Sequence, residues 1–371
     1  MPELTIPRDL LPRDGRFGCG PSKVRPEAVA TLANVGGDLL GTSHRQAPVR
    51  DQVRRLQEGV ATLLAAPSGY EVLVAVGGAT AFWDAAAFGL VDDRSRHYVF
   101  GEFSGKFAQA TATAPWLSDP DVIEAEPGAL PIASPAPGCD VQAFTHNETS
   151  TGVMQSPVRT DDALVLVDAT SAAGGLPVDL SQTDAYYFSL QKGLGSEGGL
   201  TVAVLSPAAV ERIERIAASQ RYIPGFFDLA DALDNSRKHQ TVNTPAIATT
   251  FLAAEQIEWL LTSFGSLEAV VAAQQAKAAS IYDWAAERDW AQPFVREPDA
   301  RSLVVATVDL AEAVSAADVN RVLRANGILD TDSYRKLGRN QLRIGMFPAV
   351  DADDLVAYTA CVDWVIEQLA D

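Results

Sequence analysis

The sequence predicts an α/β protein in which a mainly parallel seven-stranded sheet forms the larger part and a smaller α+β domain follows it. Two observations support this class. Seven short apolar runs of strand length occur between residues 72 and 205, and segments with a helical pattern separate several of them. A chain of 371 residues with 47% hydrophobic content can also bury a large core. We therefore expect an N-terminal segment at 1–16, a large domain at 17–262 and a small domain at 263–371.

The large domain is expected to alternate strands with helices. The strands are predicted at 72–76, 98–100, 122–124, 141–146, 164–167, 185–189 and 201–205, and the helices at 26–35, 49–65, 81–90 and 105–113. The ligand site of such a sheet lies beyond the carboxyl ends of its strands. Five side chains with useful chemistry come just after predicted strand ends and should meet at one edge: Thr80, Phe103, Thr149, Asp168 and Lys192.

The small domain is expected to combine long helices with two strands. Helices are predicted at 246–261, 267–288, 316–326 and after residue 351, the third of them capped by Ser315, and strands at 303–308 and 342–347. The first of these helices would complete the large domain. An α+β unit of this size can close over a substrate.

Composition excludes several classes of partner. The chain has 48 acidic and 29 basic residues and a net charge of −19, which argues against nucleic acid. No apolar run is long enough to span a membrane and the N-terminus is too polar for a signal peptide, so we expect a cytoplasmic protein without a membrane partner. Cys19, Cys139 and Cys361 show no metal-type spacing, which predicts three unpaired thiols and no metal site.

Asp168 and Lys192 are the candidate catalytic pair. Asp168 ends a buried apolar run, where an unpaired charge is costly, so a cationic partner should lie nearby. Lys192 stands between apolar strands and a glycine-rich loop, where burial can lower the pKa of its amine enough to make it a nucleophile. An aspartate beside a ring nitrogen and an imine-forming lysine are what a pyridoxal phosphate enzyme needs. Alone, the pair is weak evidence, because an Asp after a strand is commonly a helix cap and a Lys before glycines is commonly a solvated loop residue.

Two further groups of residues could bind anions. The turn Gly77–Gly78–Ala79–Thr80 joins a strand to a helix, which directs backbone N–H groups and the helix dipole at one point; a plain tight connection is the alternative. It matches neither a Walker A loop nor GxGxxG. Arginines in polar loops can bind a carboxylate or phosphate through two hydrogen bonds from the planar guanidinium. A solvated basic surface would show the same sequence pattern. The residues concerned are His44, Arg45, Arg335, Arg339 and Arg343.

In combination these motifs resemble the phosphoserine aminotransferase family, fold-type I, class V pyridoxal phosphate enzymes. The resemblance runs along most of the chain and rests on FGCGPS at 17–22, GTSHR at 41–45, VGGAT at 76–80, HNETSTG at 146–152, VDATS at 167–171, SLQKGLG at 189–195 and VNTP at 242–245. It implies a homodimer with shared active sites. It also implies that the cofactor is pyridoxal 5'-phosphate.

The resemblance also assigns roles. Lys192 would bond covalently to the cofactor, Asp168 would pair with its ring nitrogen, Phe103 would cover the ring and Thr149 would contact the ring hydroxyl. Ala79, Thr80 and Gln191 would hold the phosphate, together with Asn243 and Thr244 of the partner subunit.

The activity implied is a two-stage transfer of an amino group from glutamate to 3-phosphohydroxypyruvate, a step of serine biosynthesis. Arg343 would bind the α-carboxylate, and Arg45, with His44 and Arg335, the distal carboxylate or phosphate. Some relatives also use 4-phosphohydroxythreonine, in pyridoxine biosynthesis, and the sequence leaves this second substrate open.

The chain departs from the family pattern at three places. Phe103 replaces a usual Trp, residues 81–84 replace a Gln-Phe and Pro-Asn pattern, and Tyr334–Arg335 replaces a usual His-Arg, which leaves the roles of Arg335 and Arg339 open. Two alternative functions therefore stand. One is another class V enzyme, such as a different transaminase or a cysteine desulfurase, although Gln191 occupies the position where desulfurases carry His. The other is a degenerate relative that acts as a binding or scaffold protein.

Overall fold

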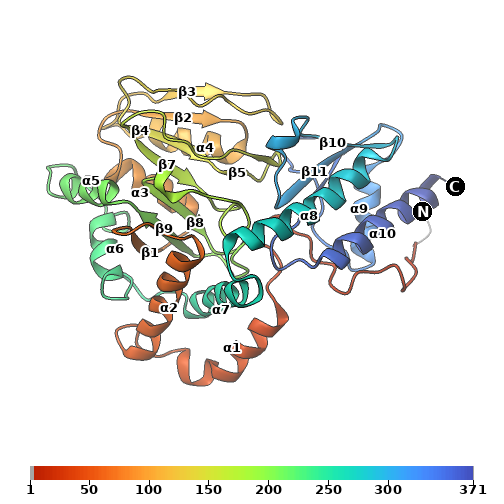
Figure 1. Ribbon diagram of the computed structural model, residues 1–371, viewed down its shortest axis with the longest axis horizontal. Coiled ribbons are helices and arrows are strands. Elements are labelled where there is room, and N and C mark those ends of the chain that lie inside the picture. Colours follow the sequence, from red (N-terminus) through yellow and green to blue (C-terminus); the bar gives the residue numbers. More distant parts are fainter. Residues whose placement is uncertain (1–3, 371) are drawn as a thin grey trace.

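The computed structural model describes residues 4–370 and shows one large sheet between two layers of helices, with a smaller sheet and three helices beside it (Figure 1). Residues 1–3 of the expected N-terminal segment and residue 371 lie outside the described part. The helices are α1 Pro26–Leu39, α2 Ala47–Leu63, α3 Ala79–Gly89, α4 Glu102–Ala112, α5 Pro207–Ala217, α6 Leu229–Ser236, α7 Ile247–Phe264, α8 Leu267–Ala286, α9 Ala316–Ala325 and α10 Ala352–Ala370. The strands are β1 Glu71–Val76, β2 Ser95–Val99, β3 Asp121–Glu124, β4 Val141–Thr145, β5 Asn147–Glu148, β6 Val153–Met154, β7 Leu164–Asp168, β8 Ala185–Ser189, β9 Leu200–Leu205, β10 Ala291–Pro293, β11 Val305–Leu310 and β12 Gln341–Gly345, and short 3-10 helices occupy Leu180–Gln182 and Pro298–Ala300.

The large sheet has seven strands in the order β1-β9-β8-β7-β4-β2-β3. The neighbours from β8 to β3 pair in parallel, whereas β9 runs antiparallel to both β8 and β1. Consequently β1, β2, β4, β7 and β8 all end at the same edge of the sheet. The predicted mainly parallel seven-stranded sheet is confirmed, and all seven predicted strands belong to it.

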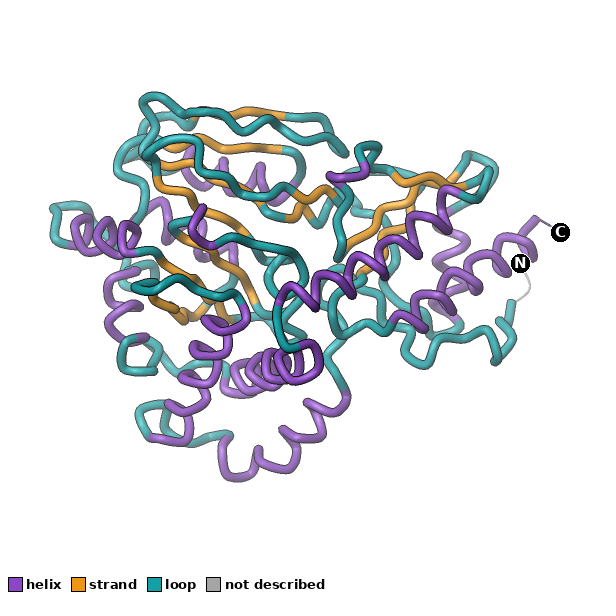
Figure 2. Tube along the Cα trace, in the orientation of Figure 1, coloured by secondary structure: helices purple, strands orange, loops and turns teal. Residues whose placement is uncertain are grey.

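Helices cover both faces of this sheet because its strands are apolar on both sides (Figure 2). Along β7, Val165 and Val167 face the cluster that contains α2 and α7, whereas Leu164 and Leu166 face the cluster that contains α3 to α6. All five residues of β7 are buried. Asp168 therefore reaches the sheet edge on a rigid, fully packed element.

The C-terminal part has its own core. The antiparallel sheet β10-β11-β12 packs with α8, α9 and α10, and Ile281, Val308, Leu323, Ile344 and Val362 are among the residues buried there. This arrangement agrees with the α+β unit expected after the large sheet. Where one domain ends and the next begins stays a prediction.

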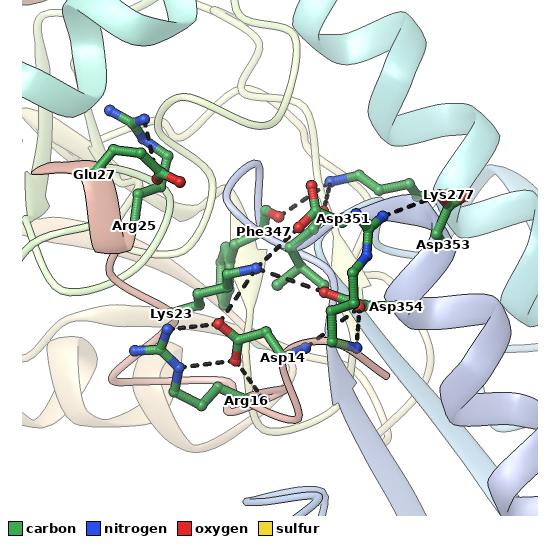
Figure 3. Close-up of polar contacts among 12 residues, drawn as sticks. Asp14, Arg16, Lys23, Arg25, Glu27, Lys277, Phe347, Asp351, Asp353 and Asp354 are labelled. Atoms are coloured by element: carbon green, nitrogen blue, oxygen red, sulfur yellow. Dashed lines mark hydrogen bonds and ion pairs between the residues drawn. The ribbon is translucent and has the colours of Figure 1, made fainter. Parts of the chain in front are cut away.

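Residues 14–23 are linked to this C-terminal part by a cluster of charges around the buried ammonium of Lys23 (Figure 3). The ammonium of Lys23, 6% exposed, lies 3.1 Å from Asp351, 3.5 Å from Asp14 and 3.7 Å from Asp354. Lys277 of α8 donates to the carbonyls of Phe347 and Val350 at 3.1 Å each. Main-chain bonds add to this, because Gly345 N–H donates to the carbonyl of Phe17 at 2.7 Å. These contacts tie the segment to β12 and to the start of α10.

The structure also contains elements that were not predicted. Helices α5 and α6, strand β10 and the two-residue pair β5–β6 lie in stretches to which the sequence pattern assigned nothing. Three helices begin earlier than predicted: α2 at Ala47 instead of 49, α3 at Ala79 instead of 81 and α4 at Glu102 instead of 105. In α4 the reason is a distant cap. Glu148 accepts the N–H groups of Phe103 and Ser104, and a local pattern cannot reveal a cap 45 residues away.

Candidate active site

A cavity of about 350 Å³ lies at the edge where the parallel strands end. It is lined by Cys19, Gly20, Pro21, Gly78, Ala79, Thr80, Trp83, Phe103, Thr145, Asn147, Thr149, Asp168, Thr170, Ser171, Gln191, Lys192, Tyr334 and Arg343. The five side chains expected at one edge are all in this set. The small domain contributes Tyr334 and Arg343, so the cavity lies between the two cores.

Lys192 follows β8 and is 8% exposed. Its ammonium donates to Thr149 Oγ1 at 2.7 Å and lies 5.2 Å from the centroid of the Phe103 ring. Ser22 fixes the main chain at this point, because its N–H donates to the carbonyl of Gln191 at 2.8 Å and its hydroxyl to that of Lys192 at 2.6 Å. Burial lowers the pKa of Lys192 to about 8, although the negative charge of Asp168 opposes the shift. About a tenth of the amine is therefore neutral at pH 7, far more than for an ordinary lysine.

Gly20 makes room for this lysine. Its φ is +146°, and a Cβ placed on it would lie 2.7 Å from Lys192 Cε. Any other residue would press on the lysine side chain or strain the backbone. The glycine of the FGCGPS motif thus lets the N-terminal segment approach the amine closely.

Asp168 is 4% exposed and accepts two hydrogen bonds from neutral donors. The indole Nε1 of Trp83 donates to Oδ2 at 2.9 Å, and the N–H of Thr170 donates to Oδ1 at 2.9 Å. Burial raises the pKa of the Asp168 carboxyl, while these hydrogen bonds and the charge of Lys192 lower it. The cationic influence expected beside Asp168 is thus that of Lys192, but the direct contacts are neutral N–H groups.

Thr149 belongs to a buried network of neutral groups. Its hydroxyl accepts from Lys192 and donates to Ser171 Oγ at 2.9 Å. Asn147 Nδ2 also donates to Ser171 Oγ at 2.9 Å, and Ser171 in turn donates to the carbonyl of Asn147 at 2.9 Å. The network fixes the side of the cavity that faces the amine.

The first turn of α3 lines the cavity through Ala79 and Thr80. Gly78 is the N-cap and supplies no side-chain cap, so N–H groups of the first turn around Ala79 and Thr80 have no partner within the helix. Such a helix terminus favours a phosphate or carboxylate. Gln191 also lines this cavity, and its Oε1 is buried without a hydrogen-bond partner in the described chain.

Glu148 positions the ring of Phe103. It is fully buried and accepts the N–H groups of Phe103 at 3.0 Å and Ser104 at 2.9 Å, as well as the hydroxyls of Ser104 and Ser150. Because β5 carries Glu148 directly before Thr149, the ring and the threonine hydroxyl are held by one short segment.

Arg343 reaches the cavity from β12. Its guanidinium lies 5.4 Å from the centroid of the Tyr334 ring, and Nη1 donates to the carbonyl of Thr149 at 3.3 Å. Nε is buried without a hydrogen-bond partner among residues 4–370. The fork of Arg343 therefore retains donor capacity for a carboxylate.

These groups fit pyridoxal phosphate. The cavity offers a partly neutral amine for an aldehyde, a carboxylate for a ring nitrogen, an aromatic ring for stacking and a helix terminus for a phosphate. Buried polar atoms of the lining residues Gln191, Thr170 and Arg343 also lack a partner in the described chain, as expected where a bound group supplies one.

Four of the predicted site residues lie elsewhere in the single chain. Arg45 donates to Asn235 Oδ1, Gln240 Oε1 and the carbonyl of Val242, and His44 Nδ1 lies 3.1 Å from Thr244 Oγ1. We call His44, Arg45, Asn243 and Thr244 the Arg45 cluster. None of its members lines the cavity around Lys192. Their roles stay predictions, and those of Asn243 and Thr244 require a second subunit.

Arg335 and Arg339 also lie outside the cavity. Arg335 is exposed, next to the Lys336 side chain that pairs with Glu102. Arg339 binds Asp309 through two hydrogen bonds and lies 4.5 Å from the centroid of Phe294. Of Arg335, Arg339 and Arg343, only Arg343 lines the cavity. Tyr334, which stands where the family usually has His, lines it as well.

Sequence reasoning missed Trp83, Glu148, Ser22 and Ser171. Glu148 and Ser171 stand in motifs that were noted, so their proximity to Thr149 and Asp168 was a usable signal. Trp83 was set aside because residues 81–84 departed from the family pattern. Cys19, in contrast, lines the cavity with a buried thiol whose pKa is raised by burial, which does not suit a desulfurase nucleophile.

Comparison with known proteins gives a consistent result. A family model described as Aminotransferase class-V matches residues 133–330. A putative phosphoserine aminotransferase of Mycobacterium avium is 56% identical over 370 residues, with 99% of both chains covered. A phosphoserine aminotransferase of Nocardioides sp. is 55% identical over 371 residues, again with 99% of each covered.

Solved structures share the fold. The phosphoserine aminotransferase of Cytophaga hutchinsonii superposes with a TM-score of 0.87 at 24% identity, covering 95% of this chain and 99% of the other. That of Bacillus circulans subsp. alkalophilus gives 0.83 at 22% identity, covering 96% and 99%. The sequence identity over the full length and the shared fold lead to one conclusion. The chain belongs to the phosphoserine aminotransferase family of class V aminotransferases.

Proposed function

We propose that this chain is a phosphoserine transaminase that uses pyridoxal phosphate to move an amino group between glutamate and 3-phosphohydroxypyruvate. The observation that carries the proposal is the meeting of Lys192, Asp168 and Arg343 in one cavity beside the uncapped terminus of α3. The identity of more than half with relatives named for this activity supports it.

Lys192 acts as nucleophile and as base. Pyridoxal phosphate, when bound, supplies an aldehyde that exchanges amines and a ring that withdraws electrons from the carbon being deprotonated. The neutral amine of Lys192 would hold the cofactor through its aldehyde. Once the amine of glutamate has taken that place, the free amine of Lys192 would serve as the base that removes the α-proton of the substrate and holds it as an ammonium. Thr149, which contacts this amine at 2.7 Å, keeps it oriented.

Asp168 keeps the ring nitrogen protonated. An ionised carboxylate is stabilised by a cation at its side, and in return it raises the pKa of the nitrogen that it faces. Phe103 stacks on the ring with less area than a Trp would offer. Ala79, Thr80 and Gln191 hold the phosphate through N–H groups and dipoles rather than through a cation.

Arg343 binds the α-carboxylate of both substrates. Its guanidinium is held by Tyr334 and the Thr149 carbonyl, and its planar fork suits a carboxylate. The distal group, a carboxylate in glutamate and a phosphate in the oxo acid, needs a second cationic site. Arg45, with His44 and Arg335, is proposed to provide it.

A homodimer would bring the Arg45 cluster to the cavity. Asn243 and Thr244 of the partner subunit are proposed to contact the cofactor phosphate. Thr244 lies 3.1 Å from His44, and Arg45 donates to the carbonyl of Val242, within the same chain. Residues in such contact move together, so His44 and Arg45 of the partner subunit would arrive at the same cavity. The distal anion would then be bound by one subunit and the α-carboxylate by the other.

We further propose the cytosol as the compartment, because all three cysteines are free thiols. None of the helices described within residues 4–370 has the length and apolar character needed to cross a membrane.

The test is an assay of purified protein with glutamate and a panel of oxo acids. We expect a yellow protein whose absorbance changes on addition of glutamate, and turnover with 3-phosphohydroxypyruvate well above that with plain 2-oxo acids. Equal rates with phosphorylated and plain acids would contradict the proposed substrate. A colourless protein that does not bind the cofactor would contradict the reaction class. Adding 4-phosphohydroxythreonine as amino donor decides whether pyridoxine biosynthesis is a second role.

A further inference from the structure

Trp83 connects two parts of the cavity, the first turn of α3 and the carboxylate of Asp168. It lies on α3, is 4% exposed and lines the cavity. Ala79 and Thr80 in the first turn of the same helix form the proposed phosphate site. Positions three and four apart on a helix share a face, so the helix terminus and the indole point to the same side. One rigid helix thus carries both the proposed phosphate site and the contact to Asp168.

The indole is the side-chain donor to Asp168. Nε1 donates to Oδ2 at 2.9 Å, whereas Oδ1 is bound by the main-chain N–H of Thr170 at 2.9 Å. Trp83 is itself held by stacking on Phe107, with centroids 6.3 Å apart and ring planes 19° apart. A donor that cannot rotate away fixes the rotamer of the carboxylate that it binds.

The burial of Asp168 makes its charge state depend on this hydrogen bond. Asp168 ends a strand whose five residues are all buried, so burial favours its uncharged form. Hydrogen bonds from N–H groups favour the charged form and oppose burial. Without Trp83, Oδ2 would lose its only side-chain donor in the described chain.

We propose that Trp83 is a positioning residue that keeps Asp168 ionised and aimed at the nitrogen of a pyridine ring in the cavity. This inference rests on the proposed function and deepens it. Through Asp168, Trp83 would help to determine how strongly that ring withdraws electrons. In a chain with Phe103 where many relatives have Trp, the indole acts on the ring through Asp168 instead of through stacking.

The experiment compares Trp83→Phe with wild type in the full-length protein. Three quantities are measured: the dissociation constant of pyridoxal phosphate, kcat against KM, and the pH at which the absorbance of the lysine-bound cofactor changes. The other titratable groups around Lys192 and Asp168 are Cys19, Glu148, Tyr186, Tyr187 and Arg343. Of these, Tyr187 also interacts with the side chain of Trp83, but burial raises its pKa well above the usual value, so its phenol stays neutral throughout the titration.

We expect Trp83→Phe to weaken cofactor binding roughly tenfold, the scale of one hydrogen bond to a charged group. We also expect kcat to fall several-fold with little change in KM for glutamate. The pH of the absorbance change should rise, because a less positive ring withdraws fewer electrons from the imine nitrogen and leaves it more basic. A purely structural role would not move this pH.

Trp284→Phe is the matched control. Trp284 is 6% exposed and its Nε1 donates to Asp363 Oδ1 at 3.0 Å, but it lies in α8 and does not line the cavity. The same chemical change there should leave cofactor binding and the absorbance unchanged. If Trp83→Phe does not fold, the similarly sized pair Trp83→Gln and Trp83→Met replaces it, and Gln, which retains an N–H donor, should perform better.

The proposal is overturned if Trp83→Phe matches Trp284→Phe in all three measurements, or if Gln and Met at position 83 behave alike. Failure of the wild-type protein to bind the cofactor would instead overturn the proposed function, and this inference with it.

Discussion

The cavity around Lys192 and the Arg45 cluster differ in burial and in completeness. Asp168 and Lys192 are 4% and 8% exposed, and each is held by neutral donors or acceptors from neighbouring strands and helices. Arg45, Asn243 and Thr244 are exposed. The first region is assembled by one chain from elements packed on both faces of the large sheet. The second is a loop contact on the surface of the same chain.

The free binding capacity of the two regions also differs. Arg343 in the cavity has a buried Nε without a partner in the described chain, whereas Arg45 already donates to groups of its own chain. A side chain with unused donors in a buried place is prepared for a ligand. An exposed arginine bound to loop acceptors must exchange these contacts for new ones. Under the proposed homodimer, the site of covalent chemistry would be preformed in one subunit, and recognition of the distal anion would depend on assembly.

Replacing Lys192 should have the largest effect on the function of the cavity. Lys192→Ala should abolish turnover and the absorbance of lysine-bound cofactor, because no other amine lines the cavity in the described chain. The measurement is absorbance and steady-state rate at equal protein concentration. Lys277→Met is the control, since Lys277 is also buried with a pKa lowered by burial to about 7 but lies in the small domain. Activity retained in Lys192→Ala would show that the lysine is misassigned.

The second region can be tested by mixing inactive subunits. Arg45→Ala should lower kcat/KM roughly a hundredfold and leave cofactor retention nearly unchanged, because it removes a charged contact to the substrate only. If the partner's Arg45 serves each cavity, a mixed dimer of Arg45→Ala and Lys192→Ala subunits contains one complete site. Random mixing in equal amounts should then restore about a quarter of wild-type activity.

The outcome separates two arrangements. No recovery after mixing, with dimers shown to exchange, would mean that Arg45 acts in its own subunit or not at all. Arg50→Ala, which removes an exposed arginine of the neighbouring helix α2, should have little effect and serves as the surface control. Equal losses of cofactor and substrate affinity in Arg45→Ala would remove Arg45 from the substrate site.

A smaller effect is expected from Arg343→Lys. Lysine keeps the positive charge but loses the planar fork and the contact with the Tyr334 ring. We expect KM for both substrates to rise about tenfold, with cofactor binding unchanged. Arg339→Lys is the matched control, because Arg339 is bound to Asp309 outside the cavity. A larger effect at 339 than at 343 would reverse the assignment.

Much of this could be predicted from the sequence because strand patterns and strand ends are local signals. The run at 164–167 and the Asp that follows place a carboxylate at the sheet edge without any knowledge of neighbours. The meeting of Thr80, Phe103, Thr149, Asp168 and Lys192 follows from the same rule, once the strands are parallel. The roles proposed for them within the site stay predictions.

The contacts that hold these groups could not be predicted, because they join residues distant in sequence. Trp83 and Asp168 are 85 residues apart, and Glu148 caps a helix 45 residues before it. Nor could the sequence show that Arg339 is neutralised by Asp309 while Arg343 is not. Such pairings depend on packing, whereas the elements themselves depend on local patterns.

The finest test concerns the charge state of the amine. Burial lowers the pKa of Lys192 to about 8, and the negative charge of Asp168 opposes this. Because only the neutral amine attacks an aldehyde, the rate of cofactor association with cofactor-free protein should rise with pH, with a midpoint near this pKa. Asp168→Asn removes the opposing charge. The ammonium is then less stabilised, its pKa falls, and the midpoint should move to lower pH.

The shift is measured by following absorbance after mixing at a series of pH values. Asp51→Asn, an exposed carboxylate of α2, is the control and should leave the midpoint in place. An unchanged midpoint in Asp168→Asn would mean that the two charges do not interact through the cavity. A midpoint near that of a free lysine in the wild type would mean that the amine is solvated. The cavity around Lys192 would then not be preformed for covalent chemistry, and it would no longer differ in this respect from the exposed Arg45 cluster.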